Sequence, residues 1–193
     1  MYNKQNTLII IDWDDTLFPT SYMKTKIIPD QEHISNMNKL DNLIYLFFSK
    51  ASYLSTPIII TNASKKWVEE SSQLLKKTNF LIKYKIDILS SRDLCEQKYK
   101  DKTDIWKKLT FQTLYDKNKH IKNIISIGDA EYEYNALINL YDNKDNNSIK
   151  LKAVRLLEEP NIYNIIDQLE VLIKEIQNIT YKDDHLDMNF IKK

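Results

Sequence analysis

The sequence predicts an α/β protein in which a central parallel sheet lies between two layers of helices. Short apolar runs rich in isoleucine alternate along the chain with longer segments whose apolar residues recur every three or four positions. Strands that alternate with helices in this way form parallel sheets, because each helix returns the chain to the start of the next strand. With 193 residues, 42% of them hydrophobic, the chain suffices for one well-packed domain but not for two ordinary ones. We therefore expect a three-layer, Rossmann-like sandwich.

Four apolar runs have the length and the β-branched composition of buried strands. They are Leu8–Ile11, Ile58–Ile60, Ile86–Leu89 and Ile124–Ile127. A fifth segment, Ile149–Leu156, alternates more between apolar and polar residues, so it is predicted to be an edge strand.

Five further segments have the spacing or the capping residues of helices. Serine and aspartate side chains accept hydrogen bonds from the first N–H groups of a helix, and proline at a helix start loses no hydrogen bond there. The expected helices are Gln31–Leu54, one capped by Ser64 that continues through Leu75, one capped by Asp104 that continues through Leu114, one that begins near Ala130, and one from Pro160 through Ile176.

We assign residues 1–179 to the single domain and residues 180–193 to a C-terminal tail that has little apolar surface to bury. The polar tract Asp142–Asn147 is predicted to be a loop. The N-terminal residues lack the apolar region of a signal peptide, and no apolar run is as long as a membrane span. The single cysteine, Cys95, excludes an internal disulfide framework. These features favour a cytoplasmic protein without a membrane partner.

The charges of the chain are balanced, with 28 Lys and Arg against 27 Asp and Glu. This balance argues against nucleic acid or an anionic membrane as a partner. The histidines, His33, His120 and His185, are scattered and do not have the spacing of metal ligands. The candidate chemistry therefore rests on carboxylates, hydroxyl groups and lysine.

Polar residues follow the carboxyl ends of several expected strands, which is where open parallel sheets bind ligands. The first strand is followed by Asp12–Thr16, with the sequence DWDDT. The second ends at Thr61 and is followed by Asn62, and Asp129 follows the strand that ends at Ile127. We expect these side chains to meet at one edge of the sheet.

Helices beside this edge supply further candidates. Glu133 follows Asp129 by four residues, so both lie on one face if a helix begins there. Lys107 is a candidate cation near the start of a helix, and its neighbour Lys108 is the alternative. Gly128 is the only glycine of the chain, and it allows the backbone to approach a ligand closely.

This set of residue types suits phosphoryl transfer. A carboxylate such as Asp12 can attack phosphorus and form an acyl phosphate, which water then hydrolyses. Asp14, two residues on, can protonate the leaving oxygen and later deprotonate the water. Carboxylates beside a phosphate dianion repel it, so a cation such as Mg²⁺ and a lysine ammonium are needed, while Thr61 can hold phosphoryl oxygens.

In this order the motifs resemble those of the haloacid dehalogenase superfamily. Asp12–Leu17 is similar to its DxDx(T/V) motif, Ile58–Asn62 to its apolar strand that ends in Thr or Ser, Lys107 to its third-motif lysine, and Ile127–Glu133 to the GDxxx(D/E) form of its fourth motif. The likeness covers roughly residues 7–179 and extends to capless, largely protist members with the signatures DWDDTLxPT, TN and WK…F.

The resemblance implies a phosphatase with Asp12 as the nucleophile and Asp14 as the general acid and base. It further implies that Thr61, with Asn62 beside it, binds the phosphoryl group of the substrate. Lys107 would orient Asp12 and neutralise the phosphoryl charge.

The same resemblance implies a Mg²⁺ cofactor held by the Asp12 side chain, the Asp14 carbonyl and Asp129, with Glu133 in support. Two residues depart from the commonest pattern. Asp15 stands where many members have glycine, and Glu133 stands where aspartate is commoner. Glu133 could therefore bind the metal directly or lie behind the metal ligands.

Members that act on small metabolites usually carry a cap domain, for which Leu17–Pro57 and Asn62–Trp106 are too short. We therefore expect an open site that suits a bulky phosphorylated substrate such as a phosphoprotein, with small esters also hydrolysed. Two alternatives remain open. One is a phosphotransferase that passes the phosphoryl group to an acceptor other than water, and the other is a binding or scaffold protein that kept the fold without turnover.

Overall fold

The computed structural model of the protein describes residues 2–25, 30–142 and 149–191. Within these residues, six strands form one sheet in the order β3-β2-β1-β4-β5-β6, and all neighbouring strands are parallel. The strands are β1 (Thr7–Ile11), β2 (Thr56–Thr61), β3 (Asp87–Ser90), β4 (Asn123–Gly128), β5 (Lys150–Arg155) and β6 (Leu186–Asn189). The expected α/β class with a parallel sheet is confirmed.

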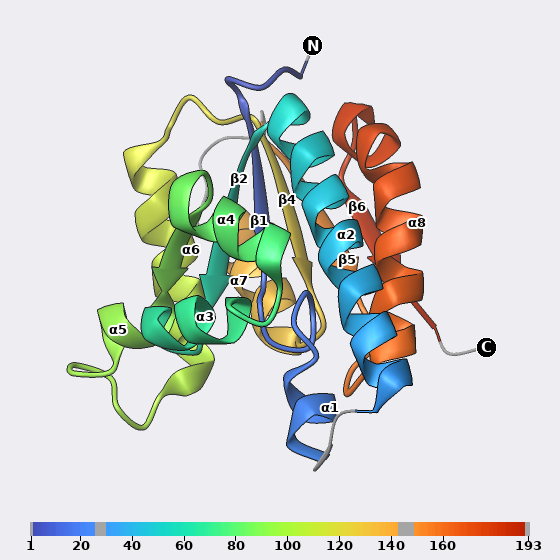
Figure 1. Ribbon diagram of the computed structural model, residues 1–193. Coiled ribbons are helices and arrows are strands. Elements are labelled where there is room, and N and C mark those ends of the chain that lie inside the picture. Colours follow the sequence, from blue (N-terminus) through green and yellow to red (C-terminus); the bar gives the residue numbers. More distant parts are fainter. Residues whose placement is uncertain (1, 26–29, 143–148, 192–193) are drawn as a thin grey trace.

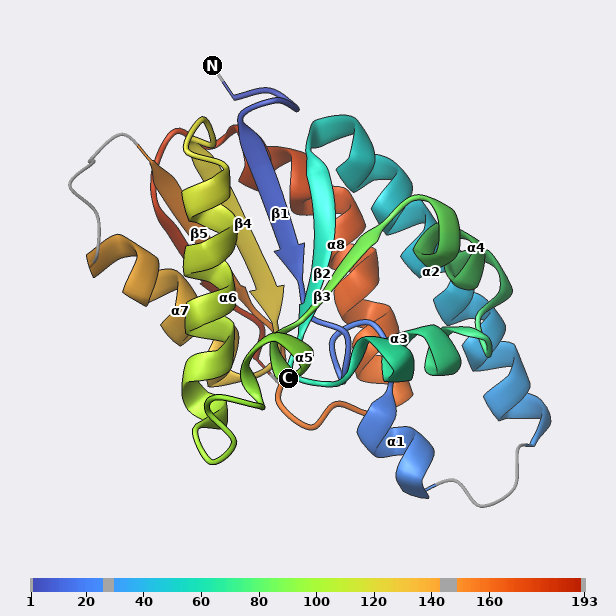
Figure 2. The ribbon, with the colours of Figure 1, turned by 90° about the vertical axis from the view of Figure 1, so that its left-hand side faces the viewer.

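Helices cover both faces of this sheet and give the three expected layers (Figures 1 and 2). The helices are α1 (Thr20–Thr25), α2 (Gln31–Leu54), α3 (Lys65–Ser72), α4 (Lys76–Tyr84), α5 (Ser91–Cys95), α6 (Thr103–Lys117), α7 (Glu131–Asp142) and α8 (Ile162–Tyr181). α2 and α8 pack on one face, and α6 and α7 pack on the other. No helix of the described residues is long and apolar enough to cross a membrane.

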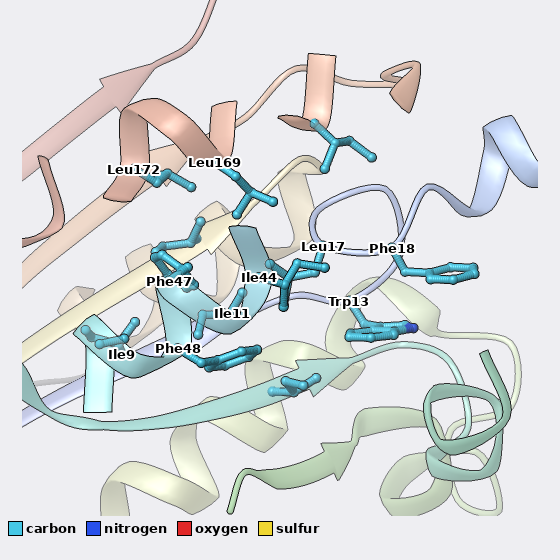
Figure 3. Packing of buried hydrophobic residues seen from close by; sticks show 14 of the residues in the cluster. Ile9, Ile11, Trp13, Leu17, Phe18, Ile44, Phe47, Phe48, Leu169 and Leu172 are labelled. Carbon is cyan, nitrogen blue, oxygen red and sulfur yellow. The ribbon is translucent and has the colours of Figure 1, made fainter. Parts of the chain in front are cut away.

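The side chains of β1 alternate between two apolar cores. Ile9 and Ile11 point into the larger core, where they join Phe47 of α2 and Leu169 of α8 (Figure 3). Leu8 and Ile10 belong to the core on the opposite face, under α6 and α7. Because β1 is covered on both faces, its residues after Thr7 are all apolar rather than alternating with polar ones.

The strand order places a topological switch point between β1 and β4. From β1 the chain winds outward to β2 and β3, whereas from β4 it winds in the other direction to β5. Connections that diverge in this way leave a crevice at the carboxyl ends of the two central strands, where ligands bind in such sheets. Asp12 follows β1 and Asp129 follows β4, so both lie at this crevice.

The prediction that Ile149–Leu156 forms an edge strand is wrong, because β6 pairs with β5 on its outer side. β6 comes from the segment that was expected to be a tail with little to bury. Its alternate residues Leu186 and Met188 are half-buried and pack against the larger core. The sequence signal is weak because the strand has only four residues and one exposed face.

The connection through α8 has a hand that parallel sheets rarely adopt. β4 to β5 and β5 to β6 move the chain in the same direction across the sheet, yet α7 and α8 lie on opposite faces. The β5–α8–β6 connection therefore has the opposite hand to β4–α7–β5. About 98% of such connections are right-handed, so these rules would not predict that β6 pairs beside β5.

Several helix boundaries differ from the expected ones. Ser64 does cap α3, and its side chain accepts a hydrogen bond from Trp67 N, but the helix ends at Ser72 and a second helix follows. Asp104 lies in the first turn of α6, and Lys102 is the capping position. α8 begins at Ile162 rather than at Pro160, and Asn161 caps it through a reciprocal capping box. In the expected loop Asp142–Asn147, Asp142 ends α7 and the other residues lie outside the described ones.

Asp41 of α2 stabilises the start of α4 from a neighbouring helix. The capping residue of α4, Leu75, has no side chain that can accept a hydrogen bond. Asp41 is buried and replaces it, because its carboxylate accepts hydrogen bonds from Lys77 N at 2.9 Å and from Thr78 N and Oγ1 at 2.8 Å each. α2 and α4 are thereby fixed to one another on the same side of the sheet.

We predict that Asp41→Ala lowers the free energy of unfolding by about 1–3 kcal/mol, because three donors lose their acceptor in a buried setting. Urea denaturation measures this difference. Asp41→Asn keeps an acceptor oxygen and should lose less stability. Equal stability of all three proteins would contradict the capping role.

Candidate active site

Asp12 and the residues after it form a tight loop directly beyond β1. Asp12 N donates to Ile127 O at 2.9 Å, which continues the β1–β4 pairing by one residue. The loop closes where Leu17 N and Phe18 N both donate to Trp13 O, and Asp15 adopts a left-handed conformation with φ of 55°. Aspartate tolerates this conformation better than bulkier residues do. The loop therefore holds Asp12 and Asp14 at the mouth of the sheet.

Lys107 of α6 joins Asp12 to Glu133 in a buried ion-pair network. Lys107 Nζ donates to Asp12 Oδ1 at 2.6 Å and also to Glu133 Oε1 of α7. Lys107 is only 2% exposed, whereas its neighbour Lys108 is half-buried. The structure thus brings Lys107 to Asp12, as the third-motif assignment expected.

Glu133 also explains why glycine precedes Asp129. Glu133 Oε2 accepts a hydrogen bond from Ala130 N at 3.1 Å, so both of its carboxylate oxygens have donors. A Cβ atom at Gly128 would overlap with the Glu133 side chain. The glycine therefore makes room for the carboxylate that pairs with Lys107, which is a close approach of protein to protein rather than of protein to ligand.

Asp129 lies within electrostatic reach of the same network. Thr16 Oγ1 donates to Asp129 Oδ1 at 2.8 Å, which links the end of β4 to the loop after β1. Burial raises the pKa of Asp129 to about 7, with Glu133 adding to the rise and the Thr16 hydrogen bond opposing it. Its carboxyl group is thus poised to lose a proton near neutral pH.

The network contains more carboxyl groups than cationic groups. Burial raises the pKa of Asp12 well above its usual value against the pull of Lys107, and the charges of Glu133 and Asp129 raise it further. The pKa of Lys107 is raised by the same carboxylates, although burial works in the opposite direction. Asp12 and Glu133 thus pair with one ammonium while Asp129 lies nearby, and carboxyl oxygens are the donors that a divalent cation such as Mg²⁺ prefers.

Among the described residues, no three His, Cys, Asp or Glu side chains are grouped so that they could hold a metal ion by themselves. A cation bound beside Asp12 and Asp129 would therefore need backbone or water oxygens in addition. The expected Asp14 carbonyl is an oxygen of that kind.

Three side chains donate hydrogen bonds to the carboxylate of Asp14. Thr20 Oγ1 of α1 and Trp67 Nε1 of α3 both reach Oδ1, at 2.5 and 2.8 Å. Thr61 Oγ1, at the end of β2, reaches Oδ2 at 3.3 Å and itself accepts a hydrogen bond from Ala63 N. The structure therefore brings the expected Thr61 to Asp14.

Asn62 lies beside Thr61 at the same edge, and its Oδ1 atom is buried without a hydrogen-bond partner among the described residues. It stays a candidate for substrate binding. Sequence reasoning missed Thr16, Thr20 and Trp67 as parts of the site. Thr16 belongs to the DWDDT run and Thr20 ends the DWDDTLxPT signature, but no pattern indicates that Thr20 and Trp67, 6 and 53 residues from Asp14, meet its carboxylate.

Comparison with known proteins gives no family model, no curated protein and no solved structure that matches this chain. The resemblance to the haloacid dehalogenase superfamily therefore stays a prediction from the motifs. What stands independently is the parallel sheet and the group of side chains at its switch point.

We predict that the metal-free protein loses stability as the pH rises from about 4 to about 7. A carboxyl group whose pKa is raised to about 7 on folding, from an ordinary value of 3.8, keeps a proton in the folded state that the unfolded chain releases. Asp129→Asn cannot titrate, so the variant should lose less stability over this range. Urea denaturation in a chelator at several pH values measures this, and parallel pH profiles would contradict it.

Proposed function

We propose that the protein is a Mg²⁺-dependent phosphohydrolase that cleaves phosphomonoesters through an aspartyl phosphate on Asp12. The observation that carries this proposal is the buried contact of Lys107 with Asp12 at the switch point of the sheet. A buried lysine fixes one oxygen of Asp12 and supplies positive charge where a phosphate dianion would approach. A purely structural ion pair would not need further carboxylates beside it.

In the first step, a carboxylate oxygen of Asp12 attacks phosphorus while the bond between phosphorus and the ester oxygen breaks. Asp14 gives its proton to that leaving oxygen. In the second step, Asp14 takes a proton from water, the water oxygen attacks phosphorus, and the bond to Asp12 breaks. Asp14 suits this exchange because it is half-buried and held by three donors beside Asp12.

Asp12, Asp129 and the carbonyl of Asp14 are the groups that would hold Mg²⁺. When bound, the cation offsets the repulsion between these carboxylates and the phosphate and polarises a phosphoryl oxygen. Glu133 supports the site from behind by pairing with Lys107. Thr61, whose hydroxyl group is 3.3 Å from Asp14 Oδ2, would bind a phosphoryl oxygen.

We further infer that the site is open. The segments that could carry a cap supply α1 and α2 before β2, and α3, α4 and α5 before α6. α2 and α4 contribute Phe47 and Ile82 to the larger core, so these helices belong to the sandwich. An open mouth admits bulky phosphorylated substrates, including phosphoproteins, as well as small esters.

We predict that the wild-type protein hydrolyses an aryl phosphate with Mg²⁺ and that Asp12→Asn abolishes this activity. Asp14→Asn should lower kcat by about 100-fold or more for esters with poor leaving groups, because these need the proton. Release of inorganic phosphate measures both effects. Activity that survives Asp12→Asn would contradict the nucleophile. A wild-type protein that binds Mg²⁺ without any turnover would favour the binding or scaffold alternative.

We predict that Lys107→Met lowers kcat by about 100-fold or more, whereas Lys108→Met stays near the wild-type rate. The two variants lose the same charge from adjacent positions of α6, but only Lys107 contacts Asp12. Circular dichroism verifies that both remain folded. Equal rates for the two variants would show that the contact with Asp12 has no part in turnover.

A further inference from the structure

Three aromatic side chains lead from the core to the mouth of the site. Trp13 and Phe18 are stacked, with ring centroids 5.7 Å apart, and both are buried (Figure 3). Phe18 meets Trp67 edge to face at 6.2 Å. Trp67 ends the row and is 36% exposed, so the protein itself covers only part of this indole.

The exposed indole lies directly beside Asp14. Its Nε1 atom is 2.8 Å from Asp14 Oδ1. An indole N–H can only donate, so Oδ1 stays an acceptor while Trp67 is in place. Oδ1 also accepts a hydrogen bond from Thr20 Oγ1, whereas Oδ2 has only the longer contact with Thr61, so Oδ2 is the freer oxygen to carry the proton that Asp14 transfers.

If the proposed function is right, the position of Trp67 restricts which leaving groups of a phosphomonoester the site accepts. An acid that protonates a leaving oxygen lies within hydrogen-bond distance of it. The atoms attached to that oxygen are then next to Asp14, and the indole that touches Asp14 is next to them. Flat rings gain from contact with an indole, and aliphatic rings of equal size gain less.

We propose that Trp67 forms a ring-binding subsite for the leaving group, so the preferred substrates are phosphomonoesters with an aromatic ring close to the ester oxygen. Phosphotyrosine side chains and aryl or arylmethyl phosphates belong to this class. The position of the Trp67 side chain is fixed from two sides. Ser64 caps the helix that carries it, and Phe18 packs against its ring. The open mouth leaves room for the rest of the substrate molecule to which the ring is attached.

Two matched esters test this subsite. Benzyl phosphate and cyclohexylmethyl phosphate have the same phosphate, methylene link and number of ring atoms, and their leaving alcohols have similar acidity. We expect kcat/KM to favour the benzyl ester by about 2- to 10-fold. Trp67→Leu should remove the preference. Trp67→Phe lacks the donor to Asp14, so it should lower kcat for both esters while it keeps their ratio.

A binding measurement distinguishes failure of this subsite from failure of the proposed function. Phenethylphosphonate and its cyclohexyl counterpart cannot be hydrolysed, and calorimetry with Mg²⁺ present should show the same preference and its loss in Trp67→Leu. Phe80→Leu, which changes an exposed aromatic residue of α4, is the control that should keep it. Equal use and equal binding of the paired compounds would overturn the subsite while leaving the phosphatase intact. Selective phosphonate binding without hydrolysis of either ester would instead overturn the proposed function.

Discussion

The ion pair of Lys107 with Asp12 and Glu133 is the interaction on which the site depends. It ties the loop after β1 to α6 and α7, three elements that are far apart in the sequence. A buried charge without a partner is costly, so each member of this network needs the others. The network also explains Gly128, since only glycine leaves space for the Glu133 side chain.

Electrostatic imbalance in this network gives the site its chemical character. Asp129 adds a third carboxylate, and burial raises its pKa to about 7. An excess of buried negative charge would be a poor way to stabilise a domain. Under the proposed function, these carboxyl groups would bind a divalent cation, which would offset their repulsion of a phosphate dianion beside Asp12. The burial of several carboxyl groups close together thus accounts both for the raised pKa values of Asp12 and Asp129 and for the proposed chemistry.

The interior strands and the edge strand β3 could be predicted from the sequence, whereas the edge strand β6 could not. β1 and β4 are buried on both faces, so their isoleucine runs identify them as strands. β6 is short and half-exposed, and the hand of its connection is rare. The break between α3 and α4 depends on Asp41, which reaches α4 from α2, and no local pattern records such a contact.

The site divides in the same way. Asp12, Lys107 and Asp129 are brought together as their motifs predict, because the carboxyl ends of parallel strands meet at one edge. Thr20 and Trp67 were missed because their roles follow from where α1 and α3 pack against Asp14. If Asp12 is the nucleophile, it carries a phosphoryl group during turnover, and mass spectrometry of protein quenched in acid during turnover detects such a group. We expect the mass of one phosphoryl group on the peptide that contains Asp12, removable by hydroxylamine. A phosphoryl group on any other residue, or none while substrate is being consumed, would contradict the account.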